Sequence, residues 1–166
     1  MSDIAALATV ALTLADYAAA DAQGKLNIIG GGISGVGFDP AQGISTRFSL
    51  VAQIAIPRDR CPAELALEIA LLDATGDVAD LPGPAGPQKM RVGQVVNIEI
   101  PSPVPGSGVP REALRGVATT ILDFGNGLPL TPGAVYTWRL QIDGDETHEV
   151  LYPFGVSGPP PAPVIG

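Results

Sequence analysis

The stretch VYTWRLQIDGDETHEVLYPFGV, residues 135–156, decides the fold class, because it reads as two strands joined by a turn. Apolar and polar side chains alternate with a period of two, which is typical of half-buried β-strands. An Asp-Gly pair supplies the turn between the two runs. The core-phase positions are Tyr136, Trp138, Leu140 and Ile142, then His148, Val150, Tyr152, Phe154 and Val156. The stretch predicts a β-hairpin with Trp138 as a core anchor and His148 partly buried on the returning strand.

The same period recurs upstream. Residues 47–56 alternate until Pro57, which cannot donate to a ladder, and residues 64–71 alternate until the turn DATGD. We expect each of these two strands to have one solvent-facing side. Further strands are predicted in VALTLADY (10–17), KLNII (25–29), MRVGQVVNIEIP (90–101) and VATTILDF (117–124), with DAQG joining the first two. The pattern predicts an all-β fold, an antiparallel β-sandwich of about seven to nine strands.

Helix has little room in this chain. PREALRG, residues 110–116, has proline in its first turn and glycine at its end, so it predicts one helical turn. The residues after Ser2 predict another short helix. LPGPAGP (81–87) and PSPVPGSGVP (101–110) predict loops stiffened by proline.

The tail SGPPPAPVIG favours extended polyproline II conformation. We therefore expect one sandwich domain over residues 1–156 and an extended arm over residues 157–166. The arm residues that we expect to contact a partner are Pro159, Pro160, Pro161, Val164 and Ile165.

Composition bounds the function. The chain has 166 residues, with 17 Asp and Glu against 9 Lys and Arg, for a net charge of −8. This balance opposes nucleic-acid binding, which needs clustered basic side chains. The single Cys61 excludes an internal disulfide, and the single His148 leaves no cluster for zinc. The first segment lacks a basic start, and Asp16 breaks its apolar run, so we expect neither a signal peptide nor a membrane span.

The motif NIIGGGISG, residues 27–35, has the glycine spacing of a dinucleotide-binding fingerprint. That fingerprint needs a helix after its last glycine, because the helix N-terminus holds the pyrophosphate. Here Gly37, Pro40 and Gly43 occupy the helix positions, and no acidic residue lies at the distance required for the ribose. We expect no cofactor, and we interpret Gly30, Gly31, Gly32 and Gly35 as a strand that runs into a tightly packed bend.

Other motifs resemble catalytic or metal sites only in part. Ser34 lacks the second glycine of a nucleophile elbow, and Asp123-Phe124-Gly125 lacks the accompanying kinase motifs. Asp143, Asp145 and Glu146 lack the longer ligand series of a calcium loop. Cys61 lies between Arg58 and Arg60 on one side and Pro62 on the other, without a Cys/His pattern. We expect no catalytic and no metal-binding residues.

Two stretches carry a resemblance: LTLADYAAADAQGKLNIIGGG (12–32) and LPLTPGAVYTWRLQIDGDETHEVLYPFGV (128–156). Together they resemble an uncharacterised family of immunoglobulin-like β-sandwich proteins of high-GC bacteria and their phages. The resemblance implies an immunoglobulin-like sandwich and brings no known activity. The second stretch also resembles the closing hairpin of immunoglobulin-like domains, which implies that Pro132, Gly133 and Tyr136 form a corner.

These observations favour a non-enzymatic structural or interaction protein, most concretely an accessory component of a phage virion or a similar large particle. Its expected partners are protein subunits of a larger assembly, with this chain as a homo-oligomer or present in several copies, in a virion or the cytoplasm. The alternative is a module that binds sugar or another small ligand through its end loops, although only eight aromatic residues are available. An enzyme that uses flavin or NAD is the least favoured hypothesis.

Overall fold

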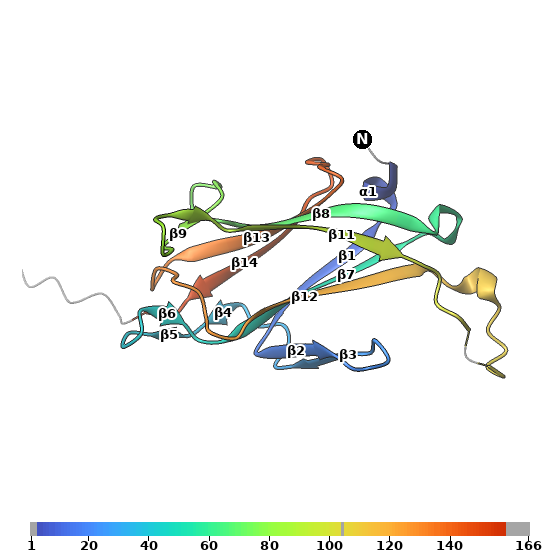
Figure 1. Cartoon of the computed structure of the whole chain (residues 1–166), viewed down its shortest axis with the longest axis horizontal. Coiled ribbons are helices and arrows are strands. Elements are labelled where there is room, and N and C mark those ends of the chain that lie inside the picture. Colours follow the sequence, from blue (N-terminus) through green and yellow to red (C-terminus); the bar gives the residue numbers. More distant parts are fainter. Residues whose placement is uncertain (1–2, 104, 159–166) are drawn as a thin grey trace, which may run out of the picture.

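The computed structural model describes residues 3–103 and 105–158 (Figure 1). The arm residues Pro159, Pro160, Pro161, Val164 and Ile165 lie outside the described residues. The elements in chain order are α1 (Asp3–Leu7), β1 (Thr9–Ala15), β2 (Tyr17–Ala20), β3 (Leu26–Ile29), β4 (Gly35–Val36), β5 (Phe38–Asp39), β6 (Ile44–Ser45), β7 (Phe48–Ile56), η1 (Arg58–Arg60), β8 (Ala63–Leu72), β9 (Asp80–Leu81), β10 (Gln88–Lys89), β11 (Arg91–Ile98), η2 (Arg111–Ala113), β12 (Gly116–Phe124), β13 (Val135–Ile142) and β14 (Val150–Val156). No helix among them is long and apolar enough to cross a membrane.

Two sheets form the sandwich. The first has the order β1-β7-β12, and the second has the order β11-β8-β13-β14-β4. All neighbours are antiparallel except β4, which runs parallel to β14. The prediction of an antiparallel sandwich of about seven to nine strands is confirmed, since these two sheets contain eight.

The strand order is that of an immunoglobulin-like domain. Among the seven long strands, the first, second and fifth in chain order pair in one sheet, and the other four pair in the second. β11 takes the place of the extra strand that variable domains add beside their third strand. The first strand changes sheets, since β1 pairs with β7 and the chain then returns to pair with β14 through β4. The short hairpin of β2 and β3 is inserted at this change.

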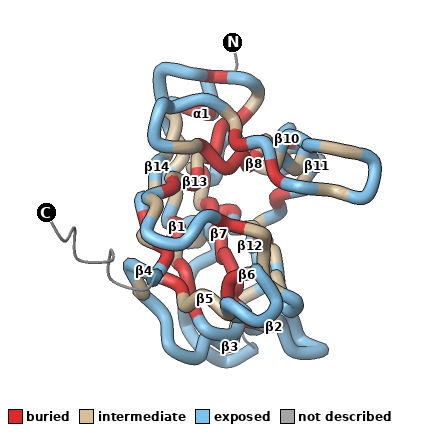
Figure 2. Tube along the Cα trace, turned by 90° about the vertical axis from the view of Figure 1, so that its left-hand side faces the viewer, coloured by how far each residue is buried: buried red, intermediate tan, exposed pale blue. Residues whose placement is uncertain are grey.

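An aromatic group fills the middle of the core. Trp138 is fully buried, with its ring 5.4 Å from the ring of Phe124 and 6.4 Å from that of Phe154. Phe48 packs on the other side of Phe124, at 4.9 Å between centroids. In Figure 2 the buried positions follow β7 through the centre of the molecule, whereas the hairpin of β2 and β3 is mostly exposed.

The connection into β13 forms a tight corner. Gly133 has a positive φ of 78°, which favours glycine, and its N–H donates to the carbonyl of Val156 at 2.9 Å. The hydroxyl of the buried Tyr136 accepts a hydrogen bond from the N–H of Thr131 at 3.1 Å. The structure therefore places Pro132, Gly133 and Tyr136 at one corner, with the tyrosine tying the corner to its own strand.

Two strand predictions need correction. The hairpin of β13 and β14 forms, but β14 begins at Val150, and His148 lies exposed in the connecting loop. The reason is that the Asp145 carboxylate accepts the N–H groups of Thr147 and His148, which makes a second turn after the Asp-Gly turn. The expected strand VALTLADY is also interrupted at Asp16, where the chain leaves β7 and starts the inserted hairpin. The helical turn expected at 110–116 is a 3-10 helix, η2.

Candidate interaction surface

The hairpin of β2 and β3 projects beyond the sandwich at the lower side of Figure 1. Its turn is the predicted DAQG. The Asp21 side chain accepts the N–H groups of Gln23 and Lys25, both at 2.8 Å, and Gly24 takes a positive φ of 77°. An aspartate that bonds its own backbone two residues on is a common turn former. The turn is thus specified by local sequence.

Glycines return the chain from the hairpin to the sandwich. Gly30 has a φ of 63°, and a Cβ at this position would collide with the Asp16 carboxylate. Gly32 has a φ of 82°, and the N–H groups of Gly32 and Ile33 both donate to the carbonyl of Leu14. Where a dinucleotide fingerprint needs a helix, the chain forms the strands β4 and β5 instead.

A polar network attaches the hairpin to the outer face of the first sheet. The N–H of Ala18 donates to Ser49 Oγ at 3.2 Å, and this hydroxyl donates to Asp123 Oδ1 at 3.0 Å. Arg47 completes the network with an ion pair to Asp123 Oδ2 at 3.0 Å. Ser49 is fully buried, although it lies on the face of β7 that was expected to be exposed to solvent. Val51, two residues along on the same face, is 1% exposed. That expectation is wrong for this half of β7, because the hairpin covers it.

The anchored hairpin leaves apolar side chains exposed. Ile29 is 63% exposed, and Tyr17 and Ile28 are each 38% exposed. Tyr17 lies directly across from Ile29 in the hairpin, and the Arg47 guanidinium lies 4.6 Å from the centre of the Tyr17 ring. Ile28 pairs with the buried Ala18 and therefore lies on the opposite face of the hairpin. We call Tyr17, Ile29 and Arg47 the hairpin surface. It combines exposed apolar area with an arginine stacked on a tyrosine, side chains that are enriched in protein interfaces.

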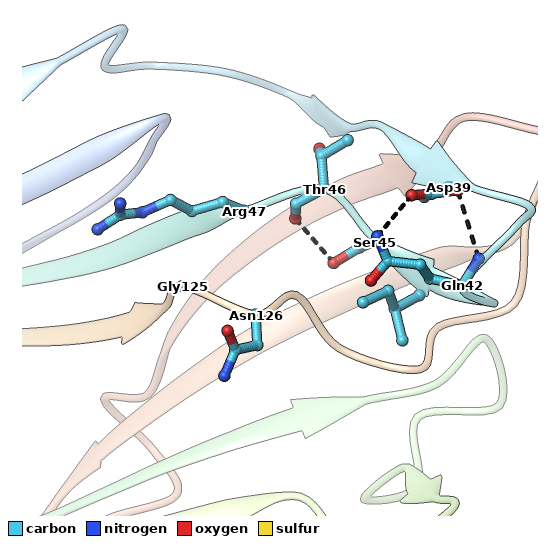
Figure 3. A pocket seen from close by; sticks show the side chains of 8 residues that line it. Asp39, Gln42, Ser45, Thr46, Arg47, Gly125 and Asn126 are labelled. Carbon is cyan, nitrogen blue, oxygen red and sulfur yellow. Dashed lines mark hydrogen bonds between the residues drawn. The ribbon is translucent and has the colours of Figure 1, made fainter.

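A shallow polar hollow lies beside Arg47 (Figure 3). It is lined by the β5–β6 hairpin and by Gly125 and Asn126 after β12. Several of its polar side chains are already engaged: Gln42 donates to Asp39 at 3.0 Å, and Ser45 donates to the carbonyl of Thr46 and accepts the N–H of Leu128. The hollow therefore belongs mainly to the packing of the β5–β6 hairpin against the loop after β12.

The residues whose sequence motifs resemble catalytic or metal sites lie apart from one another, and their contacts are structural. Asp143 accepts the N–H of Ala66, which ties the Asp-Gly turn to β8. Cys61 donates to the carbonyl of Pro57 at 3.5 Å. Over residues 3–103 and 105–158, no three His, Cys, Asp or Glu side chains are close enough to hold a metal ion.

The His148 side chain pairs with Asp145 in a structural role. Its Nδ1 lies 3.1 Å from Asp145 Oδ2, and the Asp145 side chain is 5% exposed. The hydrogen bond from His148 lowers the pKa of Asp145, and the two backbone N–H groups lower it further against the opposing effect of burial. The pair stabilises a turn of the core hairpin.

Sequence reasoning identified the glycine bend and the DAQG turn but missed the hairpin surface. The local signal was the run Tyr17 to Ile29, which is apolar at both ends of a short hairpin. The sequence could not show that Ser49 and Asp123 hold this hairpin in place, because their two strands are adjacent in the sheet but far apart in the sequence.

These features define the class of the protein: an immunoglobulin-like β-sandwich whose first strand carries an inserted, anchored hairpin. The chain belongs to the family of unknown function DUF6941, whose model matches residues 10–156. The expectation of an uncharacterised family is confirmed, while its bacterial and phage context stays a prediction. No curated protein matches the chain.

One similar solved structure is that of the CooA pilin subunit from enterotoxigenic Escherichia coli. The identity is 13%, the TM-score is 0.34, and the match covers 91% of this chain and 99% of that chain. At this TM-score the likeness supports no statement about fold or function, and none of the proposals below rests on it.

Proposed function

We propose that this protein is a non-enzymatic interaction subunit of a larger protein assembly and that it contacts a partner protein through the hairpin surface. The observation that carries the proposal is the combination of a fixed backbone and exposed apolar side chains. Ser49 and Asp123 hold the hairpin by hydrogen bonds, yet Ile29 remains 63% exposed. A surface that is already ordered loses little conformational entropy on binding, which favours affinity.

The chemistry of the surface suits a protein partner. Tyrosine and arginine carry much of the binding energy in protein interfaces, and here Arg47 already lies over the Tyr17 ring. Ile29 next to this pair adds apolar area that is removed from water on contact. The expected partner is a protein with a small apolar depression and an acidic rim facing Arg47.

The more specific proposal is an accessory component of a phage virion or a similar large particle, located in the virion or the cytoplasm. It is supported by the resemblance of residues 12–32 and 128–156 to proteins of high-GC bacteria and their phages. The proline-rich arm, residues 157–166, is proposed as a second contact with the particle. Sandwich domains commonly serve as structural subunits, which is an argument by analogy of fold.

The test is co-sedimentation of the full chain with large particles from the native source, measured by mass spectrometry against a major subunit. We expect a fixed ratio for the natural chain and a drop of about tenfold or more for Ile29→Ser. Val135→Ser is the matched control, because Val135 is 54% exposed on β13, a different strand, and this variant should keep the natural ratio. Recovery of the natural chain only as a small free species would contradict the particle proposal.

A further inference from the structure

β11 forms one end of the five-stranded sheet, and within residues 3–103 and 105–158 no strand pairs along its outer edge. The carbonyl of Met90 accepts the N–H of Leu71 at 2.9 Å, and the β11–β8 register continues from there without a break to Ile98 and Ala63. Alternate residues of a strand point their backbone groups to opposite sides. The N–H and C=O groups of Arg91, Gly93, Val95 and Asn97 therefore point away from β8, toward the open side.

The opposite end of the same sheet is blocked. On β14 the N–H of Gly155 donates to Ser34, and the N–H of Val156 donates to Ala134 beside β13. By the same alternation, the backbone of Pro153 faces away from β13, and proline has no N–H to offer there. A proline at this place prevents a further strand from pairing, which is how natural sheets protect their edges. β11 contains no proline and has no lysine along its open side.

The side chains along the open edge are arranged symmetrically around Val95. Arg91 and Glu99 each lie four residues from Val95, carry opposite charges and are exposed. Val95 itself is 60% exposed. Within the described part of the chain, neither Arg91 nor Glu99 takes part in an ion pair. Antiparallel pairing of β11 with a second β11 would thus place each arginine opposite a glutamate.

β12, the other long edge on this side of the sandwich, is a weaker candidate. Its residue Val117 is already bridged to Glu99, and its terminal charges are engaged. Asp123 bonds Arg47 and Ser49, and Arg115 reaches Thr9 Oγ1 and the carbonyl of Ala55. Because the backbone of Glu99 is already bridged to Val117, a partner strand can pair with the open edge of β11 only as far as Asn97.

We propose that β11 is a self-association edge, where two copies of this chain pair antiparallel about a two-fold axis at Val95. Backbone bonds would join Val95 to Val95 of the partner subunit and Gly93 to Asn97 of the partner subunit, about six hydrogen bonds in all. Arg91 would face Glu99 of the partner subunit twice by symmetry. This surface shares no residue with the hairpin surface, so the two proposals can fail separately.

The test is the dissociation constant of the dimer, measured on the full chain by sedimentation equilibrium at moderate salt. Arg91→Glu should raise the dissociation constant by about tenfold or more, because two like-charge pairs then face each other. Glu99→Arg alone should do the same, and the double variant Arg91→Glu, Glu99→Arg should restore the natural value. Arg111→Glu makes the same charge change on the exposed η2 and should leave the dissociation constant unchanged.

A backbone variant tests the same edge without charge. Val95→Pro removes an N–H that β8 does not use, so the circular dichroism spectrum and melting should persist while dimers are lost. A chain that stays monomeric at every concentration would overturn the proposal, as would a dimer that survives both Arg91→Glu and Val95→Pro. Ile29→Ser should leave the dimer intact, and a dimer lost in this variant instead would assign self-association to the hairpin surface and also overturn the β11 proposal.

Discussion

The two hairpins of the molecule, β13–β14 and β2–β3, are built from the same local signals and end in opposite environments. Each has a turn with an aspartate and a positive-φ glycine, Gly144 in one and Gly24 in the other. β13 lies between β8 and β14 and has the first sheet across from it, so Trp138 is fully buried. Among the described residues, β2 and β3 pair with each other alone and lie on the outside of a sheet, so Ile29 stays exposed.

The comparison teaches that apolar side chains at alternate positions predict a strand but do not predict whether the apolar face of that strand is buried. Burial depends on whether another layer lies across from that face. The core hairpin is stabilised by apolar area removed from water, whereas the surface hairpin is held by the hydrogen bond of the Ala18 N–H to Ser49, which is itself bonded to Asp123. The two should respond differently to substitution.

The largest expected effect is in the core hairpin. Trp138→Ala should lower the free energy of unfolding by about 3–5 kcal/mol, because it removes buried ring contacts and leaves a cavity. Chemical denaturation measures this value. Ile29→Ala in the surface hairpin should change it by less than about 0.5 kcal/mol. Similar losses in the two variants would mean that the hairpins do not differ in burial.

A smaller effect is expected where the surface hairpin is attached. Ser49→Ala leaves the Ala18 N–H and the Asp123 carboxylate without their buried partner and should cost about 1–3 kcal/mol. Hydrogen exchange should accelerate at the amides of residues 17–29 more than at those of β13. Ser102→Ala is the control, since Ser102 is an exposed loop residue. Uniform acceleration over the whole chain would argue against a locally attached hairpin.

The smallest effect is expected at the turn of the core hairpin, in acid. The pKa of Asp145 is lowered below its ordinary value of 3.8, first by the His148 hydrogen bond, so the folded state favours the carboxylate. The resulting stabilisation is fully present above about pH 4 and is lost as the pH falls through the lowered pKa. Unfolding curves from pH 5 to pH 2 should show a smaller loss for Asp145→Asn than for the natural chain. Asp59→Asn, at an exposed acid, should follow the natural chain.

Much of the fold follows from period-two patterns that are local to each strand. Residues 47–56, 64–71 and 135–142 formed strands where alternation predicted them, and the turns at DAQG and after Ile142 formed where aspartate and glycine favour them. Gly30 and Gly32 lie at a bend because both take a positive φ, which favours glycine. These features depend on neighbouring residues and could be predicted.

The sequence predictions were wrong at positions where a residue far away in the sequence determines the local structure. Nothing near Asp16 signals that β1 must stop there, because the break reflects the change from pairing with β7 to pairing within the hairpin. His148 lies outside the strand predicted for it, because the buried Asp145 carboxylate accepts the N–H groups of Thr147 and His148 and so forms a turn there. Alternation predicted that Ser49 faces solvent, but in the structure the inserted hairpin covers it.

The sequence by itself determined the class of fold, its main strands and its turns, because backbone conformation and alternation are set by residues a few positions apart. Only the tertiary structure decided which apolar residues are covered and which strand edges stay open. Tyr17, Ile29 and Val95 are large apolar side chains next to or within strands, yet no second layer of the described chain lies across from them. Burial and edge pairing are properties of the assembled sheets, and for that reason the candidate contact surfaces appear only in three dimensions.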